Sequence, residues 1–251
     1  RKESSAASDV YKRQQMTSIR KIYFTTFLIF SCLLFGFRFH GTFYAFDSNI
    51  CELPMIWKHA AGTIKEIRLA KSDKYCGIEI DVNLHPDGFF ISEYFNPLNS
   101  DAPKLVDLIQ SAPSIQYWWL DFKNLEYDNA ALATSTLRDL TNMTDGRIIV
   151  ESHNFFGLFF LNTKSSQIFK AYWLAKNSKP YSYFLYLVRS IFAMALINPD
   201  FVTMFANQIG SNDYIWVGSR QRLAFTVNDE YTLNELYLKD IEVVLTDTLE
   251  P

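Results

Sequence analysis

Cysteine is scarce in this sequence, and neither sign of charge is in large excess. The chain has three cysteines in 251 residues, too few for a disulfide scaffold. Its formal net charge is −3, which excludes the strongly basic surface typical of nucleic-acid-binding proteins. Cys32 lies in an apolar segment near the N-terminus, whereas Cys51 and Cys76 can pair if the domain is exported.

Aromatic residues, in contrast, are abundant. The chain is 49% hydrophobic and 16% aromatic, with 22 phenylalanines and 14 tyrosines. A chain of this length and composition predicts one domain with a substantial core. Many of the rings must therefore pack inside that core or against a membrane.

The N-terminal part differs in character from the rest. Residues 1–15 resemble a translated sequencing adapter, and we interpret them as a non-native tail. The basic residues Arg20 and Lys21 then precede an uncharged apolar run, Ile22–Phe37, which is long for a signal-peptide core and short for a full membrane span. Residues 16–45 are therefore predicted to be a signal peptide or a signal-anchor helix, and the lack of a small-x-small cleavage site favours an anchor. The positive flank predicts a domain outside the cytoplasm, membrane-anchored or exported.

From residue 50 onward, short apolar runs alternate with amphipathic segments. The expected strands are 53–58, 77–84, 117–122, 147–151, 167–175, 201–206, 222–227 and 241–245, with a further extended segment at 89–94. The expected helices are 64–72, 101–111, 128–141, 181–197 and 230–239. Such alternation predicts parallel βαβ units. About eight strands predict an α/β fold, a compact (β/α)8 TIM barrel over residues 50–251, with a doubly wound open sheet as the alternative.

One of these strands carries two carboxylates in an otherwise apolar stretch, Gly77–Leu84. Glu79 and Asp81 are two residues apart, so in a strand they project from the same face. If the strand is buried, the two carboxylates repel each other and lose hydration, and a divalent cation is their usual partner. The alternative is an edge strand whose carboxylates face water.

Polar residues recur where the expected strands end. In a TIM barrel the catalytic residues lie at the carboxyl ends of the strands, so these residues predict a site at that rim. They are His59, Glu79, Asp81, Asp121, Lys123, Glu151, Ser152, His153 and Asn228.

Several of these stretches resemble motifs of the glycerophosphodiester phosphodiesterase family, within the phosphatidylinositol-phospholipase-C-like barrels. Residues 59–62 (HAAG) resemble the His-Arg-Gly motif, and residues 77–88 (GIEIDVNLHPDG) resemble Glu-x-Asp-Val followed by Asp-Gly. Residues 225–228 (FTVN) resemble Trp-Thr-Val-Asn, and residues 243–247 (VVLTD) resemble the closing Thr-Asp. Between them, residues 119–123 (WLDFK) resemble the Glu-x-Lys strand with Asp in place of Glu, a pattern also similar to the menorin branch.

The resemblance implies a metal-dependent phosphoric diester hydrolase that acts on glycerophosphodiesters or lipid headgroups by acid–base catalysis. It assigns Mg²⁺ or Ca²⁺ to Glu79, Asp81 and Asp121, since hard oxygen ligands suit these ions. His59 becomes an acid–base catalyst and Lys123 a phosphate contact. The expected partners are a phosphodiester small molecule or lipid headgroup and, through the N-terminal helix, a membrane, but no nucleic acid.

The sequence also departs from the family pattern. No arginine follows His59, and Glu93 and Tyr94 stand where the second catalytic histidine is expected. Glu93, Tyr94 or His153 is then the candidate for the second proton carrier. These departures keep open a catalytically degenerate barrel that acts as a binding or regulatory protein.

Two other interpretations stay open at this point. A sugar-processing barrel would use Glu79 or Glu151 as acid and base. The strongly apolar helix 181–197 either lies against a bilayer or packs as an ordinary barrel helix.

Overall fold

The computed structural model describes residues 55–72, 75–92, 102–144, 146–163, 167–174, 190–209, 220–241 and 243–251, together with Thr25, Thr26 and Ile29. The last three are helical and belong to a compact unit of residues 1–40, and the rest belong to a second unit of residues 41–251. The expected tail and most of the expected anchor lie outside the described residues. Among the residues that are described, none forms a helix with both the length and the apolar character needed to span a membrane.

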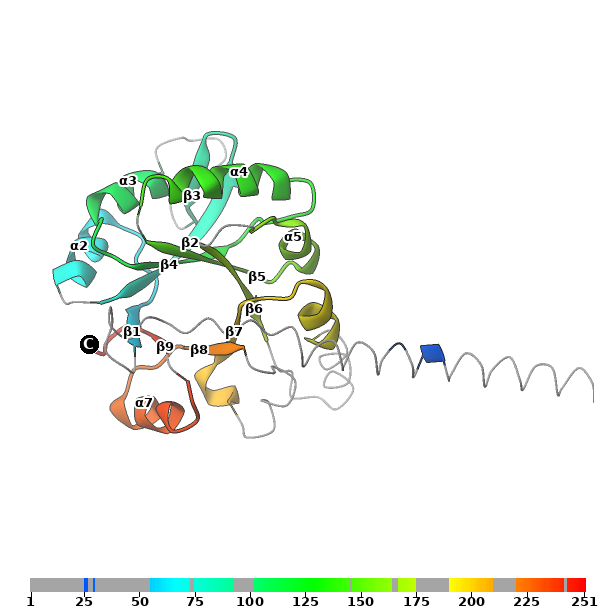
Figure 1. The fold of residues 1–251 in the computed structure, drawn as a ribbon. Coiled ribbons are helices and arrows are strands. Elements are labelled where there is room, and N and C mark those ends of the chain that lie inside the picture. The colour runs from blue at the N-terminus through cyan, green and yellow to red at the C-terminus, as the bar shows by residue number, and fades with distance from the viewer. Residues whose placement is uncertain are drawn as a thin grey trace, which may run out of the picture. The chain divides into compact units, whose positions relative to one another are not determined.

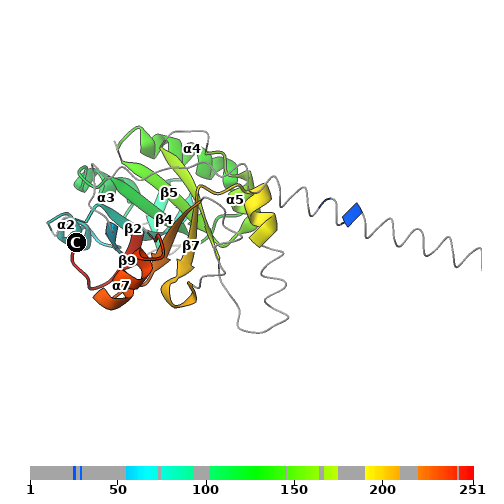
Figure 2. The same cartoon turned by 60° about the horizontal axis from the view of Figure 1, so that its bottom comes forward.

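Eight parallel strands close into a barrel in the second unit, as Figures 1 and 2 show. They are β1 (Met55–Lys58), β2 (Gly77–His85), β4 (Tyr117–Phe122), β5 (Arg147–Ser152), β6 (Ile168–Trp173), β7 (Phe201–Phe205), β8 (Gln221–Phe225) and β9 (Val243–Thr246). Strand β1 closes the ring because it pairs with β9 on one side and with β2 on the other. A ninth strand, β3 (Gly88–Ile91), pairs antiparallel with β2 as a hairpin. The predicted TIM barrel is therefore confirmed.

Short helices connect the barrel strands. They are α2 (Ile64–Ser72), α3 (Leu105–Ser111), α4 (Ala130–Thr141), α5 (Phe155–Phe160), α7 (Glu230–Tyr237) and the 3-10 turn η2 (Ala206–Gln208), and residues 190–196 are also helical. The expected helix 181–197 is thus helical in its described part. Helix α5 was not expected from the sequence.

Local hydrogen bonds explain where two of these helices begin. Thr63 precedes α2, and its hydroxyl accepts a hydrogen bond from the Glu66 backbone N–H (3.1 Å). The Glu66 carboxylate in turn accepts from the Thr63 N–H (2.9 Å), which completes a capping box. At α7 the Asp229 carboxylate accepts from the Thr232 N–H (2.7 Å). Glu66 therefore has a structural role.

Large side chains fill the interior of the barrel. The inward-facing core consists of Met55, Trp57, Tyr117, Trp119, Ile149, Phe169, Ala171, Phe201, Leu223, Val243 and Leu245. Trp57 stacks on Tyr117 with ring centroids 5.0 Å apart. A Cβ on Gly77 would lie 2.4 Å from the Trp57 ring, so β2 begins with glycine to admit that indole. These side chains fill the interior of the barrel below the carboxyl ends of its strands. A site can therefore form where the strands end.

Candidate active site

Three carboxylates lie at one level across three neighbouring strands. In the parallel register, Asp81 of β2 is opposite Asp121 of β4, and Asp121 is opposite Glu151 of β5. Paired residues of a sheet project from the same face, so all three point into the barrel. Glu79 lies one inward position lower on β2. One ligand oxygen from each of Glu79, Asp81 and Asp121 lies within 4.8 Å of the others.

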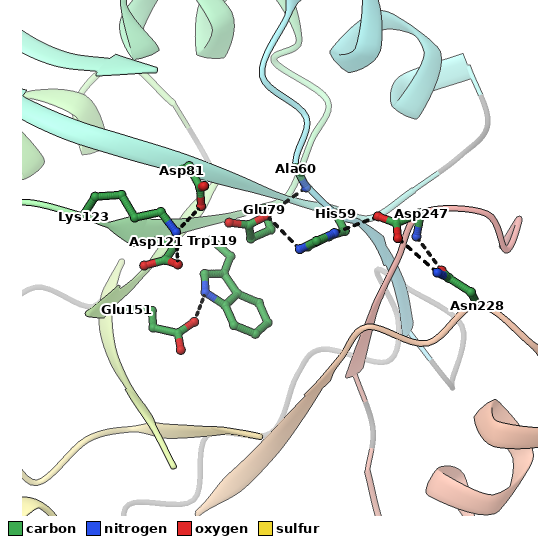
Figure 3. Close-up of polar contacts among 10 residues, drawn as sticks. All are labelled: His59, Ala60, Glu79, Asp81, Trp119, Asp121, Lys123, Glu151, Asn228 and Asp247. Atoms are coloured by element: carbon green, nitrogen blue, oxygen red, sulfur yellow. Dashed lines mark hydrogen bonds and ion pairs between the residues drawn. The ribbon is translucent and has the colours of Figure 1, made fainter. Parts of the chain in front are cut away.

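Lys123 neutralises part of this charge, as Figure 3 shows. Its Nζ lies 2.7 Å from Asp81 Oδ1 and 2.5 Å from Asp121 Oδ2. Burial lowers the pKa of Lys123, but the two hydrogen-bonded carboxylates outweigh it and raise that pKa above its ordinary value. Burial also raises the pKa of Asp121, although Lys123 opposes the shift. One ammonium therefore faces an excess of carboxylate.

Glu79 is the most deeply buried carboxylate of the predicted set, with 4% of its surface exposed. Burial, followed by the charge of Asp81, raises its pKa well above the ordinary value. Its Oε2 accepts a hydrogen bond from the Ala60 backbone N–H (2.8 Å). Ala60 has φ of 53°, in the left-handed region that residues with a Cβ avoid, so the loop after β1 holds a strained conformation where it meets Glu79.

His59 is held in place by residues that follow the last two strands of the barrel, β8 and β9. Its Nδ1 lies 2.7 Å from Asp247 Oδ1, and Asp247 Oδ2 accepts from the Asn228 amide (3.0 Å). Asn228 Oδ1 in turn accepts from the Asp247 backbone N–H (2.9 Å). Partial burial raises the pKa of Asp247, but the hydrogen bonds from Asn228 and His59 hold it below its ordinary value.

This arrangement fixes the tautomer of the imidazole. An ionised carboxylate only accepts hydrogen bonds, so the contact with Asp247 requires the proton on Nδ1. The Nε2 of a neutral His59 then carries a lone pair, and it lies 3.9 Å from Glu79 Oε2. His59 therefore presents an acceptor nitrogen toward the carboxylate cluster.

Glu151 forms a further buried polar contact, separate from that of Lys123. Its Oε2 accepts from the Trp119 indole N–H (2.7 Å), and its Oε1 accepts from the Thr203 hydroxyl (2.5 Å). Burial and then the charge of Asp121 raise the pKa of Glu151 to about 8, although both hydrogen bonds oppose the shift. The Glu151 side chain therefore links β4, β5 and β7.

The structure brings together His59, Lys123, Glu79, Asp81 and Asp121 among the predicted site residues. His153 follows β5 at the same rim and is exposed, and its positive charge lowers the pKa of Asp121. Glu93 and Tyr94 lie outside the described residues.

Sequence reasoning missed Asp247 and Thr203 as site residues. Asp247 lay within the closing motif of residues 243–247, so a signal for it was present. Thr203 occupies an inward position of β7, and no sequence pattern marked it.

Comparisons with known proteins give a fold likeness and no close sequence relative. No family model matches the sequence, and no curated protein is significantly similar to it. A phosphodiesterase from Oleispira antarctica, solved with the product sn-glycerol-3-phosphate, has a similar structure (TM-score 0.55, 17% identity, 78% of this chain and 93% of that chain covered).

Two further structures are similar. One is a glycerophosphodiester phosphodiesterase from Parabacteroides distasonis (TM-score 0.58, 13% identity, 77% and 92% covered). The other is a calcium-dependent phosphoinositol-specific phospholipase C from a Gram-negative Pseudomonas species (TM-score 0.52, 8% identity, 80% and 92% covered). The fold is therefore the TIM barrel found in glycerophosphodiester phosphodiesterases, and the resemblance inferred from the motifs is confirmed at the level of the fold.

Proposed function

We propose that this protein is a metal-dependent phosphoric diester hydrolase that acts on glycerophosphodiesters or lipid headgroups. The observation that carries the proposal is an imidazole held by Asp247 beside a surplus of carboxylates, of which Glu79 is buried and Asp81 and Asp121 are half-buried. The Nε2 of His59 lies 3.9 Å from Glu79, while Asp247 holds its other nitrogen. Both features lie at the carboxyl end of the barrel, where TIM barrels carry their chemistry.

The donor set of the cluster fits a hard divalent cation. Glu79, Asp81 and Asp121 would hold it, since Mg²⁺ and Ca²⁺ prefer carboxylate oxygens. Bound there, the ion would supply neutralisation of the charge on the non-bridging phosphate oxygens. Among the described residues one ammonium, that of Lys123, pairs with these carboxylates, and the remaining negative charge supports this assignment.

His59 would transfer a proton at Nε2. Cleavage of a phosphodiester requires a base that takes the proton of the attacking hydroxyl, from water or from the substrate, as the new P–O bond forms. It also requires an acid that protonates the leaving alcohol as the old P–O bond breaks. Asp247 would stabilise the imidazolium formed on His59, as carboxylates do in other histidine-centred sites.

Lys123 would contact the phosphate. Its ammonium already lies between two carboxylates, so it stays protonated and positioned at the level where the anion would enter. His153 and Glu93 are the candidates for the second proton carrier. His153 is supported by its place at the rim after β5.

The solved neighbours support the substrate class. One is a phosphodiesterase in complex with sn-glycerol-3-phosphate, and another is a calcium-dependent phospholipase C specific for phosphoinositol. The similarity of these proteins to this chain is a similarity of fold alone. Glycerophosphodiesters and lipid headgroups are therefore substrates that we propose for this chain.

We also propose that the barrel lies outside the cytoplasm, anchored or exported. Cys76 is disulfide-bonded, and its partner lies outside the described residues. Disulfides persist mainly in oxidising compartments. The basic flank before the apolar run Ile22–Phe37 supports the same orientation.

The test is hydrolysis of bis(p-nitrophenyl) phosphate and glycerophosphocholine by the full chain in detergent. Each substrate is assayed with Mg²⁺, with Ca²⁺ and with EDTA. We expect metal-dependent turnover that falls at least about 10³-fold in His59→Ala and Glu79→Ala. His85→Ala is the matched control, because His85 lies in the β2–β3 hairpin beside Asp87.

Absence of turnover from a folded protein that still binds the cation would contradict the proposed reaction. That result would favour a degenerate barrel that binds its ligand without cleaving it. Turnover that persists in EDTA and in both variants would instead place the chemistry elsewhere.

A further inference from the structure

The outward face of helix α5 is aromatic. Its sequence is FFGLFF, and only Gly157 and Leu158 of its six residues are buried. Phe156, Phe159 and Phe160 are 62%, 40% and 48% exposed. Tyr127, which is 62% exposed, extends this face, since its ring centroid lies 4.6 Å from that of Phe160. We refer to Tyr127, Phe156, Phe159 and Phe160 as the aromatic surface.

The packing of α5 keeps these rings outside. A Cβ on Gly157 would lie 2.7 Å from Leu125 Cγ and 3.0 Å from the Leu125 carbonyl oxygen, so the helix rests on that loop through a glycine. The Asn154 side chain caps the helix by accepting from the Gly157 N–H (2.9 Å). The rotation of α5 is therefore fixed with its phenylalanines toward solvent, at a cost in apolar surface left in water.

The aromatic surface lies at the same end of the barrel as the candidate active site. Tyr127 follows Lys123 by four residues in the segment after β4, and Phe156 follows His153 by three in the segment after β5. Helix α5 packs against β5 on the outside of the barrel, as Figure 1 shows. Tyr127 and Phe160 also line an open groove of about 490 Å³ between α4 and α5.

We propose that the aromatic surface docks on a lipid bilayer and turns the mouth of the barrel toward the headgroups. The aromatic surface combines three apolar phenylalanine rings with one tyrosine, which has a polar hydroxyl. This combination suits the boundary between acyl chains and headgroups, where aromatic side chains concentrate. The chain also carries the apolar run Ile22–Phe37 behind Arg20 and Lys21, a segment suited to hold the protein at a membrane. Docking itself does not depend on the proposed activity, whereas its use to reach lipid substrates does.

The test measures contact with acyl chains by fluorescence. Full chains carrying Phe156→Trp or Phe159→Trp are reconstituted into phosphatidylcholine vesicles with or without brominated acyl chains. The fluorescence of the introduced indole is the emission of the variant minus that of the parent protein. It should be about twofold lower in brominated vesicles, because interfacial rings insert below the headgroups and bromine on the acyl chains quenches them. Tyr231→Trp is the matched control, because Tyr231 is an exposed aromatic residue (75%) on α7. Helix α7 follows β8, which is three strands away from β5 around the barrel.

Two results would overturn docking on a bilayer. One is equal quenching of the indoles introduced at positions 156 and 231, since the anchor alone would then account for it. The other is an oligomer of the full chain in detergent that Phe156→Glu dissociates, as measured by light scattering, which would identify a second copy of the chain as the occupant.

A second measurement tests the consequence for substrate and rests on the proposed function. The ratio of hydrolysis of a bilayer phosphodiester to that of a water-soluble one should fall about tenfold in Phe156→Glu and stay unchanged in Tyr231→Glu. Quenching with an unchanged ratio would retain the docking and reject its role in catalysis. Quenching with no hydrolysis at all would reject the proposed function alone.

Discussion

Two clusters of charged side chains lie at opposite ends of the barrel strands. At the amino ends, Asp200 accepts a hydrogen bond from the Lys170 N–H (2.8 Å), and burial raises the pKa of Asp200 although this bond and the charges of Lys170 and Arg220 oppose the shift. Arg220 also donates to the Pro199 carbonyl (2.9 Å) and to Asn198 Oδ1 (2.8 Å). Counted over the described residues, this cluster has one carboxylate for two cations. On the same count, the active-site cluster has three carboxylates, the proposed metal ligands, for one lysine.

The comparison teaches that an excess of carboxylates over cations, and not a shifted pKa, distinguishes the candidate site. Burial raises the pKa of Asp200 as it raises that of Asp121. At Asp200 the surrounding donors and cations complete the cluster, which is the pattern of a structural ion group. At Asp121 the described residues place one lysine beside three carboxylates, an excess of negative charge that the proposed cation would neutralise.

The largest expected difference between the clusters is in metal binding and turnover. Asp121→Asn should lower metal-dependent hydrolysis at least about 10³-fold, because it removes one of the three carboxylates of the proposed metal site. Asp200→Asn should leave the apparent affinity for Mg²⁺ or Ca²⁺ within about twofold of the parent. Isothermal titration of the cation measures binding in both variants. Equal loss of cation binding in Asp121→Asn and Asp200→Asn would mean that the different ratio of carboxylates to cations in the two clusters has no role in metal binding.

A smaller difference between the clusters is expected in the free energy of unfolding without metal. Substitutions in the two clusters should change it in opposite directions. Asp200→Ala should lower the free energy of unfolding by about 3 kcal/mol, because it leaves the Lys170 N–H without its acceptor and removes a counter-charge from the buried cations. Glu79→Gln should raise the free energy of unfolding by about 1 kcal/mol in EDTA, since it removes a buried charge next to Asp81. Urea unfolding with unchanged m-values measures both shifts. Destabilisation by Glu79→Gln would show that Lys123 already balances the cluster.

The smallest expected effect concerns the pH dependence contributed by Glu151. Its pKa is raised from an ordinary 4.5 to about 8 in the folded protein, so between these values the folded state holds a proton that the unfolded state has released. Stability from this group is therefore present below pH 4.5 and is lost as pH rises toward 8. Glu151→Gln mimics the protonated form and should reduce this loss by about 1 kcal/mol in EDTA. Parallel stability–pH curves for variant and parent would contradict the raised pKa.

Much of the fold was predictable because its elements have clear local signals. The strand 117–122 and the helix 64–72 match β4 and α2 at both ends. A continuous apolar run between turns marks the first, and a capping box followed by amphipathic spacing marks the second. Helix α5 was missed because FFGLFF is apolar on every side and has no period to read.

The site was only partly predictable, because its contacts join distant strands. Alternation along one strand placed Glu79 and Asp81 on the same face, and the strand order then brought Asp121 beside them. The partner of His59 could not be found in this way. Asp247 is 188 residues away, and the contact depends on β9 closing the barrel against β1.

That closure has a consequence for the synthesis of the chain. Strand β1 pairs with β9 at four positions and with β2 at one, so the first strand acquires its main neighbour only when the last has been made. A nascent chain that has reached α5 already contains Asp81, Asp121 and Lys123, but His59 still lacks Asp247. The contact of His59 with Asp247 therefore forms only after β9 has been made, and a nascent chain that lacks β9 is expected to lack the proposed proton transfer at His59.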